Sequence, residues 1–307
     1  VDTINEGKIH IVEPGLQEMV EDVVSKKNLH ASIQPEQSDA FIIAVPTPFM
    51  VDTEENLPHP DLSYIFSAAN EIAPYIKKGD LIILESTSPV GTTEKLLEIL
   101  KEKRPDLSFP GSSVEADINI AYCPERVLPG KIIEELVSNN RVVGGITNEC
   151  SDKAKDLYEI FLEGKCYLTN SRTAEMVKLT ENASRDVSIA FANELSIICD
   201  DENIDVWELI NLSNLHPRVN ILEPGPGVGG HCIAVDPWFI VSRSQKAKLI
   251  KTSREINDSK PMWVIEKIKE MVTQFCKENK ANKKDICIAI YGLAFKPDID
   301  DLRESPA

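Results

Sequence analysis

Several patterns that would define a metal site, a disulfide framework or a nucleic-acid surface are missing from this sequence. Its seven cysteines are an odd number, widely spaced, and none forms a C-x-x-C pair. The five histidines form no H-x-x-x-H pattern. Such cysteine usage fits a reducing compartment, so we expect neither a bound metal nor disulfides. Basic residues number 33 against 50 acidic ones, a net charge of −17. Phosphate-backbone binding needs clustered Lys and Arg, so we expect no nucleic-acid partner.

Long apolar runs and a signal peptide are also missing. No stretch approaches the roughly 18 continuous apolar residues of a membrane span. We therefore expect a cytoplasmic protein with no membrane contact. The chain begins at Val1 without a Met and stops at Ala307 just after a charged loop. Both ends read as truncated.

The first half of the sequence alternates between apolar runs and helical patterns. Runs of this kind, buried on both faces, are typical of strands in a parallel sheet. Strand and helix in this rhythm predict an α/β fold with a doubly wound, Rossmann-like domain over residues 1–170. The expected strands are Phe41–Val45, Leu81–Leu84, Ile118–Tyr122 and Val142–Val143, and the expected helices are Leu16–Ser25, Leu62–Ile76, Thr93–Lys101 and Cys150–Leu162.

The second half predicts a central helical domain over residues 171–278. Its longest helical pattern runs from Thr173 to about Asp200 without Gly or Pro. A shorter helix is expected over Val206–Ser213, followed by amphipathic runs at Ala247–Ile256 and Lys260–Lys277. After a polar linker, Ile286–Gly292 reads as the first strand of a second Rossmann-like domain, whose beginning would be residues 283–307.

A glycine-rich stretch, residues 225–237, contains the thiol of Cys232 and, four positions later, the carboxylate of Asp236. Glycine is dense where the backbone needs φ > 0 or lets another molecule approach closely. Its literal match to the dinucleotide fingerprint is rejected, because no strand precedes it and no βαβ unit follows. The thiol could be a nucleophile, a metal ligand or inert packing. As a nucleophile it needs an activating group, for which His231 and Asp236 are the local candidates.

A thiol and a base in a chain with a nucleotide-type domain suggest oxidation of an aldehyde through a thioester. Two further readings remain open: a non-redox thiol transferase, and an inactive fragment that only dimerises through the 173–200 helix. On that helix Lys178 and Asn182 stand at i, i+4 and so project from one face. They matter for catalysis only if that face meets the Cys232 loop.

An ordered series of motifs resembles the nucleotide-sugar dehydrogenases, the family of UDP-glucose and GDP-mannose dehydrogenases. The series covers nearly the whole chain. It comprises Val45-Pro-Thr-Pro48, Glu85-Ser-Thr-Ser-Pro-Val-Gly91, Ala121-Tyr-Cys-Pro-Glu-Arg126, Glu175-Met-Val-Lys-Leu-Thr-Glu-Asn182, Pro226-Gly-Val-Gly-Gly-His-Cys-Ile-Ala-Val-Asp-Pro-Trp238, Gly292-Leu-Ala-Phe-Lys-Pro-Asp298 and Arg303-Glu-Ser-Pro306.

This resemblance implies a four-electron oxidation of a UDP-sugar at C6 to a carboxylate, with NAD as the cofactor. It further implies polysaccharide biosynthesis and a homodimer formed through the 173–200 helix. By motif, the implied catalytic residues are Cys232, Lys178, Asn182, Asp236, Glu125 and Thr87. The implied cofactor contacts are Val45, Thr47, Thr87 and Arg303, and the implied substrate contacts are Glu125, Arg126, Lys178, Asn182, Arg218, Gly229, Phe295 and Lys296.

The sequence departs from the family pattern at three points. The glycine fingerprint that cradles the NAD pyrophosphate is absent, so we expect this chain by itself to bind NAD poorly. Pro129 stands where UDP-glucose enzymes carry a second glutamate. Arg218 lies closer to the cysteine than the arginine that reaches a neighbouring subunit in those enzymes.

Overall fold

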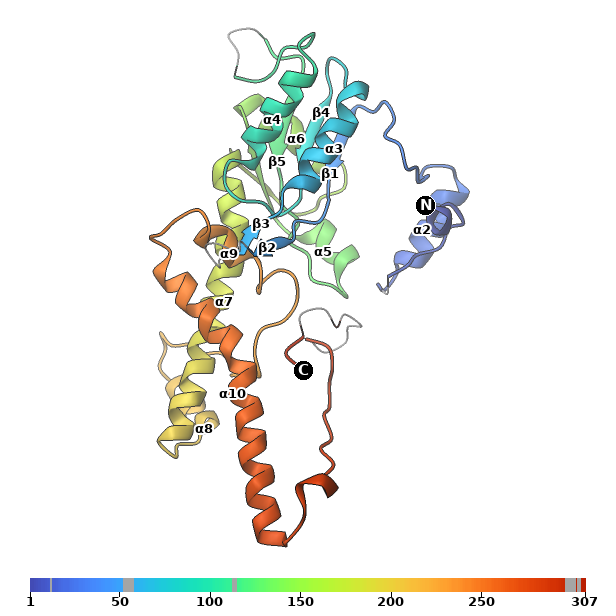
Figure 1. The fold of residues 1–307 in the computed structure, drawn as a ribbon. Coiled ribbons are helices and arrows are strands. Elements are labelled where there is room, and N and C mark those ends of the chain that lie inside the picture. Colours follow the sequence, from blue (N-terminus) through green and yellow to red (C-terminus); the bar gives the residue numbers. More distant parts are fainter. Residues whose placement is uncertain (12, 52–57, 112–114, 296–301, 303–304) are drawn as a thin grey trace. The chain divides into compact units, whose positions relative to one another are not determined.

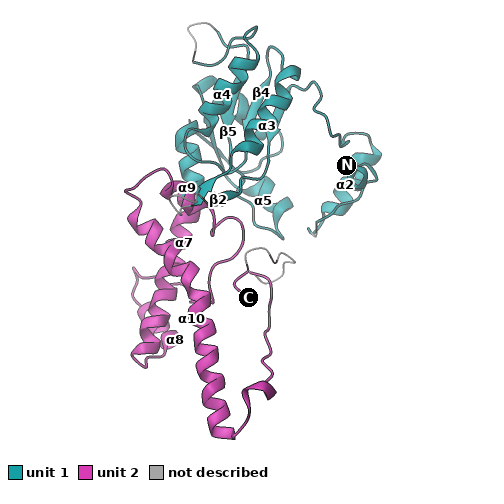
Figure 2. Cartoon of the chain, in the orientation of Figure 1, with its two compact units in different colours: residues 1–179 teal, residues 180–307 magenta. Residues whose placement is uncertain are grey.

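The computed structural model describes residues 1–307 except residues 12, 52–57, 112–114, 296–301 and 303–304 (Figure 1). The chain divides into two compact units, Val1–Leu179 and Thr180–Ala307 (Figure 2). The three domains expected from the sequence, residues 1–170, 171–278 and 283–307, remain a prediction.

A five-stranded sheet organises the first unit in the order β1-β4-β5-β6-β7. Its strands are β1 (Ala40–Ile43), β4 (Leu81–Leu84), β5 (Asn119–Tyr122), β6 (Arg141–Gly145) and β7 (Cys166–Asn170). β1, β4 and β5 are parallel, so that Ile43, Leu84 and Tyr122 end side by side. Ligands of such sheets bind beyond these carboxyl ends.

The expectation of a parallel sheet is wrong at one junction. β6 runs antiparallel to β5, while β7 runs parallel to β6. The apolar run Val142–Val143 predicted the strand β6, but it does not indicate whether that strand runs parallel or antiparallel to its neighbours. The strand β7 was not predicted from the sequence. It lies at the edge of the sheet, where its apolar residues Tyr167 and Leu168 are 54% and 44% exposed. A half-exposed edge strand carries little hydrophobic signal.

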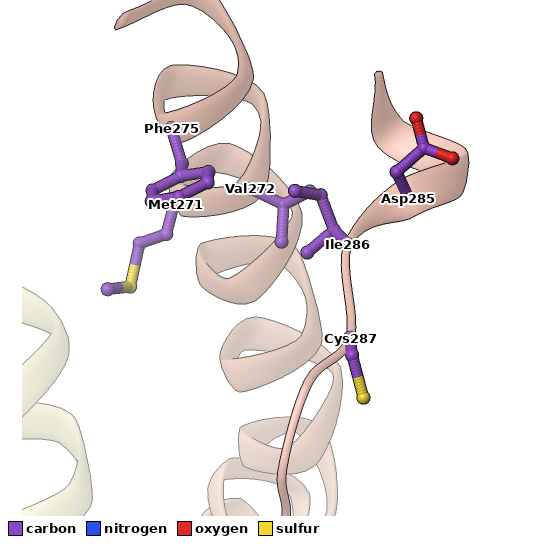
Figure 3. Close-up of a pocket in the computed structure, with 6 residues that line it drawn as sticks. All are labelled: Met271, Val272, Phe275, Asp285, Ile286 and Cys287. Carbon is purple, nitrogen blue, oxygen red and sulfur yellow. The ribbon is translucent and has the colours of Figure 1, made fainter. Parts of the chain in front are cut away.

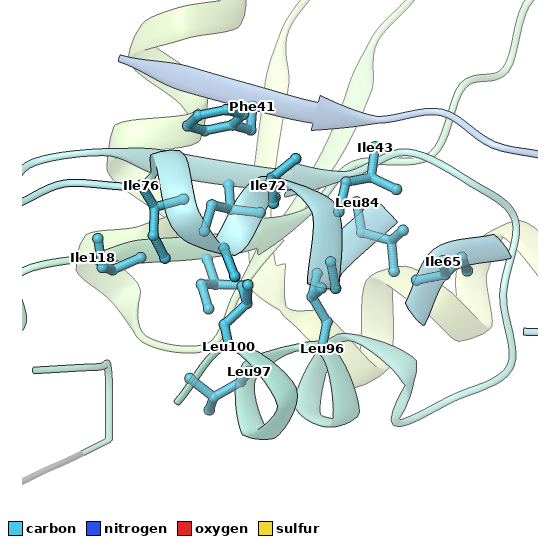
Figure 4. Close-up of a cluster of buried hydrophobic side chains, with 14 of the residues drawn as sticks. Phe41, Ile43, Ile65, Ile72, Ile76, Leu84, Leu96, Leu97, Leu100 and Ile118 are labelled. Carbon is cyan, nitrogen blue, oxygen red and sulfur yellow. The ribbon is translucent and has the colours of Figure 1, made fainter. Parts of the chain in front are cut away.

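Both faces of the central strands are buried, as the sequence predicts. On one face, Ile82 and Leu84 pack with helices α3 (Ser63–Ile72) and α4 (Thr92–Lys103) (Figure 4). On the other face, Leu81 and Ile83 pack with α6 (Asn148–Tyr158). The edge strand β1 differs, since Ile42 is 49% exposed.

The remaining elements of the first unit are short. They are α1 (Asp2–Asn5), α2 (Leu16–Ser25), β2 (Phe49–Val51) paired with β3 (Pro58–Pro60), η1 (Ala73–Tyr75) and α5 (Ile132–Ser138). The helix expected over Leu16–Ser25 is confirmed.

Long helices dominate the second unit. α7 (Ser171–Asp201) begins in the first unit and continues into the second, and α8 (Val206–Ser213), α9 (Asp236–Val241), α10 (Lys248–Asn279) and η2 (Lys283–Asp285) follow. The helices expected over residues 173–200 and 206–213 are confirmed. The two amphipathic runs after residue 247 form one helix, α10, which continues through Pro261.

The strand expected over Ile286–Gly292 is wrong in this structure, where these residues form no strand. A strand needs a hydrogen-bonded neighbour, and no described residue pairs with this segment. Ile290 and Tyr291 are accordingly 65% and 93% exposed. No helix in the described part of the chain is both long and apolar enough to cross a membrane.

Candidate active site

The carboxyl ends of β1 and β4 are tied together by Ser86. Its hydroxyl accepts a hydrogen bond from Val45 N at 2.8 Å and lies 2.8 Å from Val45 O. Val45, Thr47 and Thr87 are all half-buried around this tie. Three of the four predicted cofactor contacts therefore lie on two adjacent strand-end loops of one unit.

Glu175 joins the start of α7 to the start of α4. Its carboxylate accepts hydrogen bonds from Gly91 N at 2.6 Å, Thr93 N at 2.8 Å and Thr93 Oγ1 at 2.7 Å. Gly91 caps α4 with φ of 92°, a conformation that favours glycine. Glu175 is fully buried, and burial raises its pKa, while the hydrogen bonds from Thr93 and Gly91 oppose that shift. Lys178, half-buried, follows less than one helical turn later.

Glu125, which follows β5, is held by a buried cation. Arg141 Nη2 donates to Glu125 Oε2 at 2.9 Å, and the Arg141 side chain is 5% exposed. Arg141 also lies 3.8 Å from Glu85 Oε1 and 4.5 Å from the centre of the Tyr158 ring. Tyr158 Oη donates to Glu85 Oε1 at 2.6 Å. Glu125 is thus part of a linked set of ionisable groups at the carboxyl ends of β4 and β5.

Burial is the largest cause of the pKa shifts of Glu85 and Cys123, which lie near Arg141. It raises the pKa of Glu85, although Tyr158 and Arg141 oppose the shift. Burial likewise raises the pKa of the Cys123 thiol to about 11. Cys123 is therefore a protonated, inert thiol at neutral pH, in contrast to a nucleophile.

Cys232 lies at a turn that leads into α9. Its carbonyl oxygen accepts hydrogen bonds from Val235 N at 3.1 Å and Asp236 N at 2.9 Å. The Cys232 side chain is exposed, and Asp236 is 3% exposed. The turn therefore presents the thiol at the surface and buries the carboxylate that follows it four positions later.

Asn182 is brought to the same turn. Its amide nitrogen donates a hydrogen bond of 2.5 Å to Asp236 Oδ2. Two residues that the sequence places 54 positions apart, and that were predicted to share one site, are in direct contact.

Two glycines allow close packing on the Cys232 loop. Gly230 has φ of 82°, and a Cβ there would lie 2.8 Å from the Phe295 ring. Gly227 has φ of 149°, and a Cβ there would lie 2.9 Å from the Pro261 ring. Any side chain at either position would clash, so Phe295, a predicted substrate contact, lies against the loop two residues from the thiol.

Other predicted residues are not brought into this arrangement. Arg218 is exposed, and Gly229 is half-buried within the loop. Arg126 directs its guanidinium to Asn140 O at 3.0 Å. Lys296 and Arg303 fall outside the described residues.

A further polar group was not predicted from the sequence. Arg254, Asn257 and Lys260 of α10 are at most 2% exposed, as are Asp186 and Asn193 of α7. These residues interrupt apolar helical patterns, at spacings of three on α10 and seven on α7, which place those of each helix on one face. That interruption was the available signal.

A pocket of about 500 Å³ lies elsewhere in the second unit (Figure 3). It is lined by Met271, Val272, Phe275, Asp285, Ile286 and Cys287. None of the predicted site residues borders it, so it is not the candidate active site. No cluster of three or more metal-binding side chains occurs among the described residues.

Comparison with known protein families shows the family of this chain. The UDP-glucose/GDP-mannose dehydrogenase family matches with its NAD binding domain over residues 1–162 and with its central domain over residues 172–259. The chain belongs to this family and is a nucleotide-sugar dehydrogenase that uses NAD.

Individual relatives cover the whole chain. The UDP-N-acetyl-D-mannosamine dehydrogenase of Escherichia coli K12 is 62% identical over all of this chain and 72% of its own length. An NDP-N-acetyl-D-galactosaminuronic acid dehydrogenase of Ralstonia nicotianae is 58% identical over all of this chain and 70% of its own. The solved UDP-N-acetyl-mannosamine dehydrogenase of Staphylococcus aureus gives a TM-score of 0.83 at 46% identity, over 99% of this chain and 68% of its own.

The strand-end loops fit part of a dinucleotide. Ser88, in the loop after β4, is fully buried, and its hydroxyl finds no hydrogen-bond partner among the described residues. A buried orphan hydroxyl beside the ends of parallel strands suits a polar ligand there. The chain carries no glycine fingerprint for the pyrophosphate, and weak NAD binding by this chain remains a prediction.

Proposed function

We propose that this protein oxidises UDP-N-acetyl-D-mannosamine at C6 to UDP-N-acetyl-D-mannosaminuronate. The support is 62% identity over the full chain to an enzyme named for that substrate. The residues of the motif His231–Trp238 also resemble those of UDP-N-acetyl-D-mannosamine dehydrogenases. The structural observation that supports the proposed chemistry is the contact between Asn182 and Asp236 at the turn of Cys232.

Cys232 is the proposed nucleophile. The first oxidation removes a hydride and a proton from the C6 alcohol and leaves an aldehyde. The Cys232 thiolate adds to the aldehyde carbon, the aldehyde oxygen takes up a proton, and a thiohemiacetal forms. Loss of a second hydride and of the hydroxyl proton gives the thioester, and attack by water releases the carboxylate and returns the thiol. The exposed position of Cys232 suits attack on an entering substrate.

Lys178 and Asn182 are proposed to stabilise charge on the C6 oxygen. One supplies a full positive charge and the other an amide donor, and both stand on one face of α7. Asp236 orients Asn182 through their hydrogen bond.

Glu125 and Asp236 are the proposed groups that deprotonate the alcohol or the attacking water. Arg141 holds the Glu125 carboxylate in place at 2.9 Å. Thr87 is proposed to hold that water.

NAD, when bound, accepts the two hydrides, one at each oxidation. Val45, Thr47 and Thr87 would border it at the ends of β1 and β4, and Arg303 would contact its phosphates. Arg126, Arg218, Gly229, Phe295 and Lys296 are the remaining proposed substrate contacts. Phe295, packed on Gly230, fits that role best in the described structure.

We further propose a homodimer through α7. Phe191 and Ile198, seven positions apart on this helix, are 51% and 49% exposed. Spacing of seven places both on one stripe, which a second copy would cover. We also propose a role in polysaccharide biosynthesis, for which the uronate would be a building block, and a cytoplasmic location.

The substrate is tested on the full-length protein with a panel of UDP-sugars. UDP-N-acetylmannosamine should give uronate with two NADH per carboxylate, at a higher kcat/KM than UDP-N-acetylglucosamine or UDP-glucose. A higher kcat/KM for either of those sugars would change the assigned substrate but leave the proposed reaction in place. Acyl transfer without NADH would overturn the reaction itself.

A further inference from the structure

Four buried polar residues form one hydrogen-bonded set between α7 and α10. Arg254 Nη1 donates to Asp186 Oδ1 at 2.5 Å, and Asn257 Nδ2 donates to the same oxygen at 2.8 Å. Asn193 Nδ2 donates to Asn257 Oδ1 at 2.9 Å. All four side chains are at most 1% exposed. Burying an arginine–aspartate pair is expensive, and apolar residues of similar size often pack two helices as well or better.

The two outer members of this set reach the Cys232 loop. Asn193 Oδ1 accepts a hydrogen bond from Gly225 N at 2.9 Å, where the glycine-rich stretch begins. Arg254 Nη1 approaches Ile233 O at 3.4 Å, one residue after Cys232. The set therefore contacts the loop backbone on both sides of the thiol.

The hydrogen-bonding capacity of Asn193 is divided between the two partners. Its amide nitrogen serves Asn257, and its amide oxygen serves Gly225. Neither an apolar residue nor a carboxylate can do both, because the first has no polar atom and the second has no donor. Arg254 is likewise divided, since Nη1 serves Asp186 and Ile233 while Nη2 serves Asp258.

The same helix pair has contacts that do not reach the loop. Lys260 Nζ binds Ser196 Oγ, and Lys267 Nζ lies 2.6 Å from Asp200 Oδ2. These bonds link α10 to α7 without any bond to residues 225–233. These bonds therefore serve as a reference for links that stabilise the helix pair without holding the loop.

We propose that Asn193 and Arg254 are positioning residues that hold the Cys232 loop at Gly225 and Ile233. The inference rests on the proposed role of Cys232 as the nucleophile. By fixing the backbone on both sides of the thiol, the pair sets where the sulfur meets the C6 aldehyde. Neither residue touches substrate or takes part in proton transfer.

The test compares Asn193→Ala and Arg254→Lys with Ser196→Ala in the full-length protein. Ser196→Ala is the control because it removes buried bonds to Lys260 and to the Asn193 carbonyl, but none of the side-chain bonds that Asn193 and Arg254 make to the loop. Arg254→Lys keeps the charge beside Asp186 but lacks the fork that reaches several acceptors at once. Melting temperatures establish which variants are folded, and if one loop variant fails to fold the other carries the test.

Two quantities are measured for each folded variant: kcat and KM for the UDP-sugar, and the rate of Cys232 alkylation by iodoacetamide against pH. Site-resolved mass spectrometry follows alkylation, with exposed Cys287 as the internal reference. A misplaced reacting atom costs roughly 10- to 100-fold in rate. We expect a kcat loss of that size in Asn193→Ala and Arg254→Lys, with an altered pH profile of alkylation at Cys232 only. Ser196→Ala should match the wild type in both.

Equal melting losses in all three variants, with unchanged kcat and alkylation, would overturn the inference and leave the proposed function standing. Full activity of a Cys232→Ser enzyme would instead remove the proposed function. In that case the alkylation profile still reports whether Asn193 and Arg254 position the loop.

Discussion

Asn182 Nδ2 donates a hydrogen bond of 2.5 Å to Asp236 Oδ2, and Asp236 N in turn donates to Cys232 O at 2.9 Å. A residue of the long helix α7 is thereby connected to the thiol turn through one buried carboxylate. Asn182→Ala should lower kcat roughly 10- to 100-fold, because Asp236 loses this donor and the site loses an amide. Steady-state kinetics check this, with exposed Ser184→Ala on the same helix as the control. An unchanged kcat would show that the contact is only structural.

Tyr158 stabilises the buried carboxylate of Glu85 through the hydrogen bond at 2.6 Å. Tyr158→Phe removes that donor while Glu85 stays largely buried. We expect a loss of about 1–3 kcal/mol in the free energy of unfolding, the usual cost of a buried acceptor that loses its partner. Urea unfolding measures it. Tyr167→Phe on the exposed edge strand is the control and should change little, so equal effects in the two variants would contradict the prediction.

Glu175 accepts three hydrogen bonds at the start of α4, from the amides of Gly91 and Thr93 and from the Thr93 hydroxyl. In Glu175→Gln one carboxylate oxygen becomes an amide NH2 group that faces an N–H or O–H donor. The variant should lose about 1–3 kcal/mol of stability. Thermal or urea unfolding tests it against Glu102→Gln, an exposed position of α4. If Glu175→Gln is as stable as Glu102→Gln, the carboxylate is not required at this helix start.

Lys260 predicts a pH dependence of stability. Burial lowers its pKa from 10.5 to about 8 in the folded protein. Between these values the unfolded chain binds more protons than the folded one, so the lysine's contribution to stability increases as pH rises from about 8 to 10.5.

Unfolding of wild type and Lys260→Met at a series of pH values isolates that contribution from other titrating groups. Between pH 8 and 10.5 the difference in unfolding free energy should change in favour of the wild type. The slope should approach about 1.4 kcal/mol for each pH unit in the middle of that interval. A pH-independent difference would show that Lys260 titrates normally.

Most of the candidate site could be predicted from the sequence because the patterns that mark it are local. Glycine and proline mark the Cys232 loop whatever surrounds it, and helical spacing places Lys178 beside Asn182 on α7. Contacts between distant segments left no such mark. Arg254 and Asn193 interrupt the apolar patterns of their helices, but their contacts with the Cys232 loop depend on how α7 and α10 pack.

The errors in the predicted fold share a cause. The direction of β6 depends on the strands that pair with it, and the residues Val142–Val143 do not identify those strands. Ile286–Gly292 has the composition of a strand, but strand formation depends on a pairing partner. The runs Ala247–Ile256 and Lys260–Lys277 predicted two helices, yet α10 is continuous, and its Pro261 ring packs against Gly227. In each case tertiary packing overrode the local pattern.

The central claim, that Cys232 carries the sugar as a thioester, is tested most directly by uronate formation in Cys232→Ser. Cys287→Ser, an exposed thiol in the same unit, is the matched control. With UDP-N-acetylmannosamine and NAD, the account predicts a loss of uronate by at least about a thousand-fold in Cys232→Ser and none in Cys287→Ser. Undiminished uronate and NADH production by Cys232→Ser would contradict it.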